Sequence, residues 1–201
     1  TFGTSSAFND GLLKNRSLNN IYAMQERVIL VDQLDRKIGA MEKIRAHELG
    51  LLHRAVSVFL FNDKGELLLQ KRSSSKYHSG GLWTNTCCSH PREREENIDA
   101  AIRRLYEEMG IDSDLHHAFS FTYKSPFKNG LTEYEYDHVF IGSSEHSPEL
   151  NPEEAEDYRY AHIPDAIKHM ERNPEEYTEW FKIAIYQVDD HLKKELLNKL
   201  L

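Results

Sequence analysis

The sequence predicts a mixed α/β sandwich, in which a mixed β-sheet is flanked by helices and further helices are added at the C-terminal end. The order of patterns favours this class. Short apolar runs of strand length come first, one stretch of helical period follows, and more strand-like runs precede a helical final part. The 201 residues suit one domain. We expect residues 21–201 to form it and residues 1–20, rich in Ser, Asn and Gly, to be a loosely ordered extension.

Three apolar runs in the first half of the chain predict strands at residues 28–31, 55–61 and 66–72. The second and third runs are separated by Asn62-Asp63-Lys64-Gly65, which has the residue types of a tight turn. We therefore expect these two strands to form a hairpin.

The clearest helix is predicted between residues 97 and 110, with Gly110 as its C-terminal cap. Around a helical wheel, Glu107 falls opposite the apolar side, whereas Arg104 and Glu108 fall at its edge, where side chains can face a cleft. One apolar stripe defines that side: Ile98, Ala101, Ile102, Leu105 and Met109.

The same patterns predict strands and helices in the second half of the chain. Strand patterns occur at residues 119–124, 134–141 and 158–162, and a helix pattern occurs at residues 164–171. Pro174 then stands at a first-turn position after Asn173, and an amphipathic helical stretch extends through residue 200.

The composition of the chain indicates which kinds of partner to expect and in which cellular compartment the protein is found. The net charge is −8, from 25 basic and 33 acidic side chains, and no Lys/Arg block suits a nucleic-acid backbone, so we expect no nucleic-acid partner. The sequence shows neither an apolar run of membrane-span length nor a secretory signal, so we expect a soluble, cytoplasmic protein without a membrane partner. Cys87 and Cys88 are neighbours and cannot form a useful disulfide, and free thiols fit a reducing compartment.

Two short segments carry the chemistry. Residues 84–91, Thr-Asn-Thr-Cys-Cys-Ser-His-Pro, bring a thiol within two residues of an imidazole. Residues 133–136, Glu-Tyr-Glu-Tyr, hold two carboxylates that project from one face of a strand. A pocket built from both segments could perform acid/base chemistry supported by a divalent metal.

Residues 89–111 resemble the 23-residue box of the Nudix family, which implies a Nudix-type sheet and helices. Ser89 replaces the opening Gly of the box, and Arg104 replaces a Glu that hydrolases of the family use to bind metal. The positions that match the box are Glu95, Arg103, Leu105, Glu107, Glu108, Gly110 and Ile111.

Four separated segments, within a match from about residue 27 to residue 180, resemble one branch of that superfamily, the type I isopentenyl diphosphate isomerases. They are residues 83–91, residues 99–105, residues 133–135, and Glu42-Lys43-x-x-x-His47 followed by His53. The resemblance implies an enzyme that interconverts isopentenyl and dimethylallyl diphosphate by moving a double bond, with no redox or nucleotide cofactor. Its partner is then a small isoprenoid diphosphate, and we expect a monomer or a weak homodimer.

The resemblance also implies catalytic roles. Cys88 serves one end of the proton exchange and Glu135 the other, and Tyr123 hydrogen-bonds to Glu135 and helps to relay the proton. Trp180 faces the carbocation, which an indole ring attracts. Cys87 occupies a position where the family does not need a thiol.

Two metal sites follow from the same resemblance. His47, His53, His90, Glu133 and Glu135 form a ligand set for Zn²⁺ or Mn²⁺, between which the sequence does not choose. Glu108, the backbone carbonyl of Cys88 and the substrate hold Mg²⁺. Glu107 is left out, because it can form an ordinary ion pair with Arg103. We interpret the remaining histidines that we considered as surface or core residues: His116, His117, His138, His146, His162, His169 and His191.

The diphosphate requires cations, and the resemblance gives this role to Lys43, Arg72, Lys76 and Arg104. Two other interpretations remain open at this point. A Nudix hydrolase of a diphosphate-containing metabolite would use Glu107 and Glu108, and a non-enzymatic interaction module would use the histidines as a structural zinc site.

Overall fold

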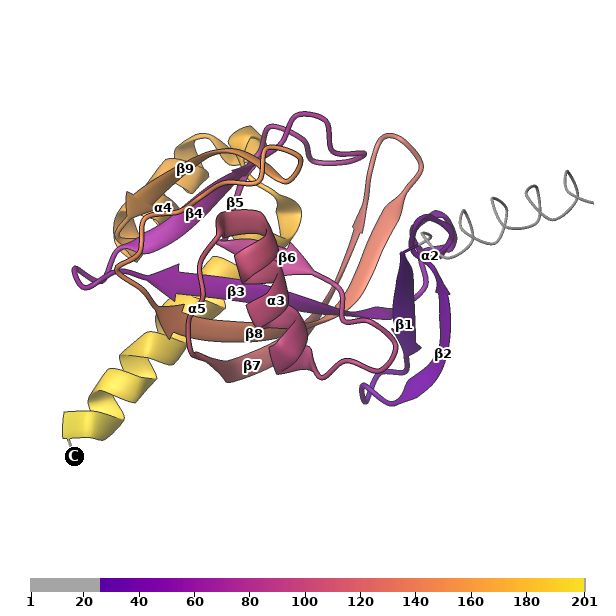
Figure 1. Cartoon of the computed structure of the whole chain (residues 1–201), viewed down its shortest axis with the longest axis horizontal. Coiled ribbons are helices and arrows are strands. Elements are labelled where there is room, and N and C mark those ends of the chain that lie inside the picture. Colours follow the sequence, from indigo (N-terminus) through magenta and orange to yellow (C-terminus); the bar gives the residue numbers. More distant parts are fainter. Residues whose placement is uncertain (1–25, 201) are drawn as a thin grey trace, which may run out of the picture.

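The computed structural model describes residues 26–200, and the predicted extension at residues 1–20 lies outside this range. All nine strands of the described chain join one sheet (Figure 1). Their bounds are β1 Arg27–Val31, β2 Lys37–Glu42, β3 His53–Phe61, β4 Leu67–Arg72, β5 Trp83–Thr84, β6 Cys87–Ser89, β7 Leu115–Pro126, β8 Thr132–Ser143 and β9 Ala155–Ala161. The helices are α2 Lys43–Leu49, α3 Asn97–Met109, α4 Ile163–Arg172 and α5 Glu179–Leu200, and residues Pro174–Glu176 form a 3₁₀ turn.

The sheet is mixed, as predicted. One path runs β2-β1-β3-β4-β5, β9 pairs with β4, and β7 pairs with β8. Strand β3 pairs in parallel with β8 over its whole length, whereas β6 pairs with β3 in the antiparallel sense. These pairings bring the thiol segment in β6 and the carboxylate segment in β8 to the same central strand.

Successive side chains of the central strands point to opposite faces of the sheet. Both faces are therefore apolar, and helices cover both. Val58 and Leu68 point to the face covered by α3, while Phe59 and Leu69 point to the face covered by α4 and α5. Figure 1 shows α3 in front of β3 and β8, with the yellow helix α5 behind them. None of the helices in residues 26–200 is long and apolar enough to span a membrane.

The predicted elements are confirmed in outline. The hairpin β3–β4 and helix α3 lie where the pattern put them, and Gly110 ends α3 with φ +67°. A Cβ at Gly110 would lie 2.7 Å from Cβ of Glu149, so both its conformation and its neighbour favour glycine. Strands β7 and β8 extend beyond the predicted segments, and β9 begins earlier than the predicted residues 158–162.

The helical stretch after Pro174 is interrupted. Tyr177 is extended and bridges Trp83, and the amide of Thr178 donates to the carbonyl oxygen of Trp83 at 3.0 Å. Helix α5 therefore starts only at Glu179 and brings Trp180 into its first turn, beside β5 and β6. The sequence did not indicate β2, α2, β5 or β6, which are short or half-exposed.

Candidate active site

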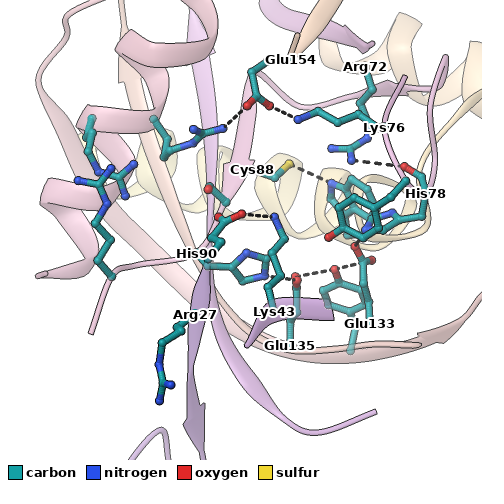
Figure 2. Close-up of a pocket in the computed structure, with 18 of the residues that line it drawn as sticks. Arg27, Lys43, Arg72, Lys76, His78, Cys88, His90, Glu133, Glu135 and Glu154 are labelled. Atoms are coloured by element: carbon teal, nitrogen blue, oxygen red, sulfur yellow. Dashed lines mark hydrogen bonds and ion pairs between the residues drawn. The ribbon is translucent and has the colours of Figure 1, made fainter. Parts of the chain in front are cut away.

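A cavity of about 540 Å³ opens at the end of the sheet where β4, β6 and β8 meet helices α2, α3 and α5 (Figure 2). Most of the residues predicted for the site line it: Lys43, Arg72, Lys76, Cys88, His90, Arg104, Tyr123, Glu133, Glu135 and Trp180. The other three, His47, His53 and Glu108, are buried in the wall, with 0%, 0% and 3% of their surface exposed.

The two carboxylates point into the cavity from β8, as the period of a strand requires. Tyr123 lies directly across from Glu135 on β7. Its hydroxyl oxygen is 2.6 Å from Oε2 of Glu135 and 3.0 Å from Oε2 of Glu133. Because a hydroxyl carries one proton, it donates to one carboxylate and accepts from the other only if that one is protonated.

The surroundings of the two carboxylates shift their pKa values in opposite directions. Burial, together with the charge of Glu135, holds the pKa of Glu133 well above its usual range. Burial alone would also raise the pKa of Glu135, but the adjacent imidazoles of His53 and His90 outweigh burial and hold that pKa well below its usual range. These opposite shifts favour a proton on Glu133 over one on Glu135, and the shorter hydrogen bond of the Tyr123 hydroxyl, at 2.6 Å, goes to Glu135.

Three imidazoles converge on Glu135. The parallel register pairs His53 with Glu135, and His90 lies just past the end of β6. Oε1 of Glu135 is 3.0 Å from Nε2 of His90 and 3.5 Å from Nε2 of His53. The rings of His47 and His53 are 4.7 Å apart.

The orientation of these rings suits a metal. Nδ1 of His47 bonds the carbonyl oxygen of Lys43 at 2.7 Å, and Nδ1 of His53 bonds that of Leu51 at 2.8 Å. The carbonyls make each Nδ1 the donor, so each Nε2 presents a lone pair. Within residues 26–200 both Nε2 atoms are buried without a hydrogen-bond partner. Burial and the neighbouring histidines also lower the pKa of His47 to about 4, which keeps it neutral, as a ligand must be.

Four of the five predicted ligands lie together as a cation requires, while Glu133 groups with His47 and His78 instead. One ligand atom from each of His47, His53, His90 and Glu135 lies within 4.8 Å of the others, and all four residues are buried. Imidazole nitrogens with carboxylate oxygens are a donor set that suits Zn²⁺ or Mn²⁺.

Cys88, and not Cys87, faces the cavity. Neighbouring strand residues point to opposite faces, so the Cys87 side chain is fully buried in the core under α3. Sγ of Cys88 accepts a hydrogen bond from Nε1 of Trp180 at 3.0 Å and donates to Oδ1 of Asn85 at 3.1 Å. Burial, partly offset by Arg72, raises the pKa of the Cys88 thiol to about 12, so it is protonated at neutral pH.

The four cations predicted for the diphosphate line the cavity, each beside a carboxylate or an indole. Lys76 pairs with Glu154, which also lies 3.0 Å from Arg104. Nη2 of Arg104 contacts Oε1 of Glu108 at 2.6 Å. Arg72 lies over the Trp180 ring, 5.2 Å from its centroid.

Lys43 pairs with Glu26 at 2.8 Å, which overcomes the effect of burial and lowers the pKa of Glu26 to about 2. Nε of Arg72 and Nε of Arg104 are buried and lack a partner among the described residues, so both guanidinium groups have unused donors.

Glu108 does not present a free carboxylate. Its Oε2 accepts from Gln70 at 2.9 Å and its Oε1 pairs with Arg104, so it fits a Mg²⁺ ion only if Arg104 moves away. The substitution of Glu by Arg at position 104 thus changes the chemistry of the box, because a cation now neutralises the remaining carboxylates.

Comparison with known proteins agrees with this geometry. The NUDIX domain family matches residues 51–181. The isopentenyl-diphosphate Delta-isomerase 2 of Aromatoleum aromaticum is 49% identical over 165 residues, which cover 82% of this chain and 87% of that protein. The chain belongs to the isopentenyl-diphosphate Delta-isomerase family. A second isopentenyl-diphosphate Delta-isomerase, from Pectobacterium atrosepticum, is 47% identical and covers 82% of this chain and 92% of its own length. The resemblance drawn from the motifs is confirmed.

Solved structures agree on the Nudix fold of this isomerase-family chain. DR0079 of Deinococcus radiodurans matches with a TM-score of 0.68 and 20% identity, covering 81% of this chain and 98% of its own. A MutT protein of Methanosarcina mazei Go1 matches with a TM-score of 0.59 and 21% identity, covering 71% and 96%. At such identities the similarity concerns the fold alone.

The sequence reasoning missed several residues of this isomerase-family cavity. Glu26, Tyr77, His78 and Glu154 line it, and His78 lies 3.3 Å from Glu133. Lys76-Tyr77-His78 stands within a Ser- and Gly-rich segment, and a cluster of such side chains in a loop was a usable signal. Glu154 belongs to an acidic run before β9 and had no such signal.

Proposed function

We propose that this protein interconverts isopentenyl diphosphate and dimethylallyl diphosphate through proton transfer at the two ends of an allyl unit. The observation that carries the proposal is one cavity lined by a thiol, a tyrosine-linked carboxylate pair and a wall of cations. The thiol and the carboxylates can act as acid and base on the alkene, and the cations can bind the diphosphate.

The reaction needs two groups that exchange protons with the substrate, one at each end of the allyl unit; we call them proton stations. A proton adds to C4 of isopentenyl diphosphate, the C3–C4 double bond becomes a single bond, and positive charge develops at C3. Loss of a proton from C2 then forms the C2–C3 double bond. We assign Cys88 to one end and Glu135 to the other. Because the Cys88 thiol is protonated at neutral pH, it can store a proton between turnovers.

The charge at C3 needs a partner that does not react with it. Trp180 is 3% exposed and contacts Sγ of Cys88, so its indole ring lies beside one proton station. A desolvated cation–π contact contributes roughly 2 kcal/mol or more. A wall of this kind also keeps water from capturing the cation.

We assign a Zn²⁺ or Mn²⁺ ion to His47, His53, His90, Glu133 and Glu135. When bound, such an ion supplies positive charge that sets the acidity of the adjacent carboxyl group. Tyr123 would then hold the second oxygen of Glu135 and provide a path for its proton.

Lys43, Arg72, Lys76 and Arg104 are assigned to the diphosphate. Lys43 and Lys76 each pair with a carboxylate that an anionic ligand could displace, and Arg72 and Arg104 each have an unused Nε donor. We propose that Arg104 turns from Glu108 to the diphosphate, which would free Glu108 to bind Mg²⁺ together with the backbone carbonyl of Cys88. The domain bounds of 21–201, a cytoplasmic location and a monomeric or weakly dimeric state remain predictions.

The experiment is to incubate purified protein with isopentenyl diphosphate, Mg²⁺ and either Zn²⁺ or Mn²⁺, and to follow ¹H and ³¹P NMR spectra together. We expect the olefinic signals to change to those of dimethylallyl diphosphate while both phosphorus signals stay those of a diphosphate. Release of phosphate or a monophosphate, unaffected by Cys88→Ala, would instead favour a Nudix hydrolase. Loss of stability on chelation without any turnover would favour a structural zinc module.

A further inference from the structure

We propose that His78 is an additional ligand of the His/Glu metal site and completes a six-donor set supplied entirely by the protein. The inference rests on the proposed metal site and adds a residue to it. It starts from a second group of ligand atoms, from His47, His78 and Glu133, that lie within 4.8 Å of one another, all three residues being buried.

His78 belongs to the loop between β4 and β5, which is held tightly at its base. The amide of Arg72 donates to the carbonyl oxygen of Leu82 at 2.9 Å, and the amide of Gly81 donates to that of Arg72 at 3.0 Å. A Cβ at Gly80 would lie 2.8 Å from the carbonyl oxygen of Ser74, which is too close. This conformation of the loop therefore requires glycine at position 80. The backbone thus holds His78 over the cavity.

The imidazole ring is also oriented. It stacks on Phe127 with 4.8 Å between ring centroids and 13° between planes, and it meets the edge of Trp180. Nδ1 lies 3.3 Å from Oγ of Ser79. Nε2 therefore points at Oε1 of Glu133, 3.3 Å away (Figure 2).

The two groups of ligand atoms share His47. One group adds His53, His90 and Glu135 to it, and the other adds His78 and Glu133. Together they offer four imidazole nitrogens and two carboxylates, which is six donors, enough for the octahedral coordination that Mn²⁺ adopts and that Zn²⁺ accepts. The six ligand atoms do not form one group within 4.8 Å, so a single cation meets all six only when the side chains of His78 and Glu133 shift toward the first group as it binds.

A complete protein shell has a functional consequence. With no open position, the cation contacts neither the alkene nor the diphosphate, and it acts on the reaction only through the carboxylates that it holds. His78 would also tie the 73–82 loop to the metal. Because Lys76 lies on that loop, metal binding would order part of the diphosphate subsite.

The test compares wild type with His78→Phe, which keeps the aromatic ring against Phe127 but removes the nitrogen ligand. His116→Phe, on an exposed strand position, is the matched control. His53→Ala removes a ligand of the proposed core site. Metal-free proteins are titrated with Zn²⁺, and X-ray absorption of the Zn²⁺-loaded proteins counts the bound imidazoles.

We expect four imidazoles in wild type and in His116→Phe, and three in His78→Phe, with Zn²⁺ affinity at least ~10-fold weaker in the last. Hydrogen exchange in residues 73–82 should slow on Zn²⁺ binding in wild type but not in His78→Phe. A wild-type site with three imidazoles, or His78→Phe with an unchanged count, would overturn the assignment of His78 alone. Failure of wild type to bind one Zn²⁺ that is lost in His53→Ala would overturn the metal site itself.

Discussion

Replacing Tyr123 with Phe removes one oxygen atom from the centre of the carboxylate pair. The hydroxyl lies 2.6 Å from Glu135 and 3.0 Å from Glu133, and Tyr123 is only 5% exposed, so water does not easily replace it. A hydrogen bond to a charged group contributes about 1.5–3 kcal/mol. At about 1.36 kcal/mol for each factor of ten, kcat should fall by about 10-fold to 150-fold.

The assay is conversion of isopentenyl diphosphate at saturating substrate and metal, followed by ¹H NMR. The ring of Tyr123 packs on Phe121 with 5.7 Å between centroids, and Phe at position 123 retains that contact, so the fold and the KM should change little. Tyr136→Phe is the matched control, since residue 136 of β8 points to the opposite face from Glu135. A kcat of Tyr123→Phe within twofold of wild type would refute the role of this hydroxyl.

Four further predictions follow from the same geometry. Cys88→Ala should lower kcat by about 10²-fold to 10⁴-fold, whereas Cys87→Ala should lose stability but keep its activity; equal kinetic losses in the two variants would contradict the assignment. Since burial raises the pKa of Cys88 to about 12, its alkylation by iodoacetamide should accelerate about tenfold per pH unit from pH 8 to 11, and mass spectrometry should not show the plateau of a free thiol above pH ~8.5. Arg104→Ala should raise the KM for isopentenyl diphosphate by about 10-fold to 100-fold, while Arg103→Ala, which breaks the pair with Glu95, should leave KM within twofold in the same steady-state assay. Chelation from a solution with metal at 100 times its Kd should lower the unfolding temperature by about 5–10 °C in a calorimeter, and an unchanged transition would argue against a bound ion.

The sequence predicted those parts of the site that depend on local period. Glu133 and Glu135 share a face because side chains of a strand alternate, and the same alternation buries Cys87 when Cys88 faces the cavity. The apolar stripe of α3 put Arg104 and Glu108 at the edge of the helix, where they form an ion pair.

Other parts depend on contacts that no local pattern encodes. His47 lies on a seven-residue helix, too short to be recognised from its period, and only the family motif connected it to His53. His78 and Glu154 lie on loops, and their positions depend on the pairing of β9 with β4, which brings residue 154 beside Ser73. The ion pair of Arg104 with Glu154 likewise follows from the packing of α3 against that loop.

The central claim is that Cys88 and Glu135 exchange protons at the two ends of the allyl unit, and the measurement that tests it most directly is isomerisation in heavy water. With wild type, Mg²⁺ and the His/Glu-site metal, we expect the methyl group formed at C4 of dimethylallyl diphosphate to carry solvent deuterium, and Cys88→Ala and Glu135→Gln each to abolish this incorporation. Formation of the isomer without deuterium at C4, or full exchange in either variant, would contradict it.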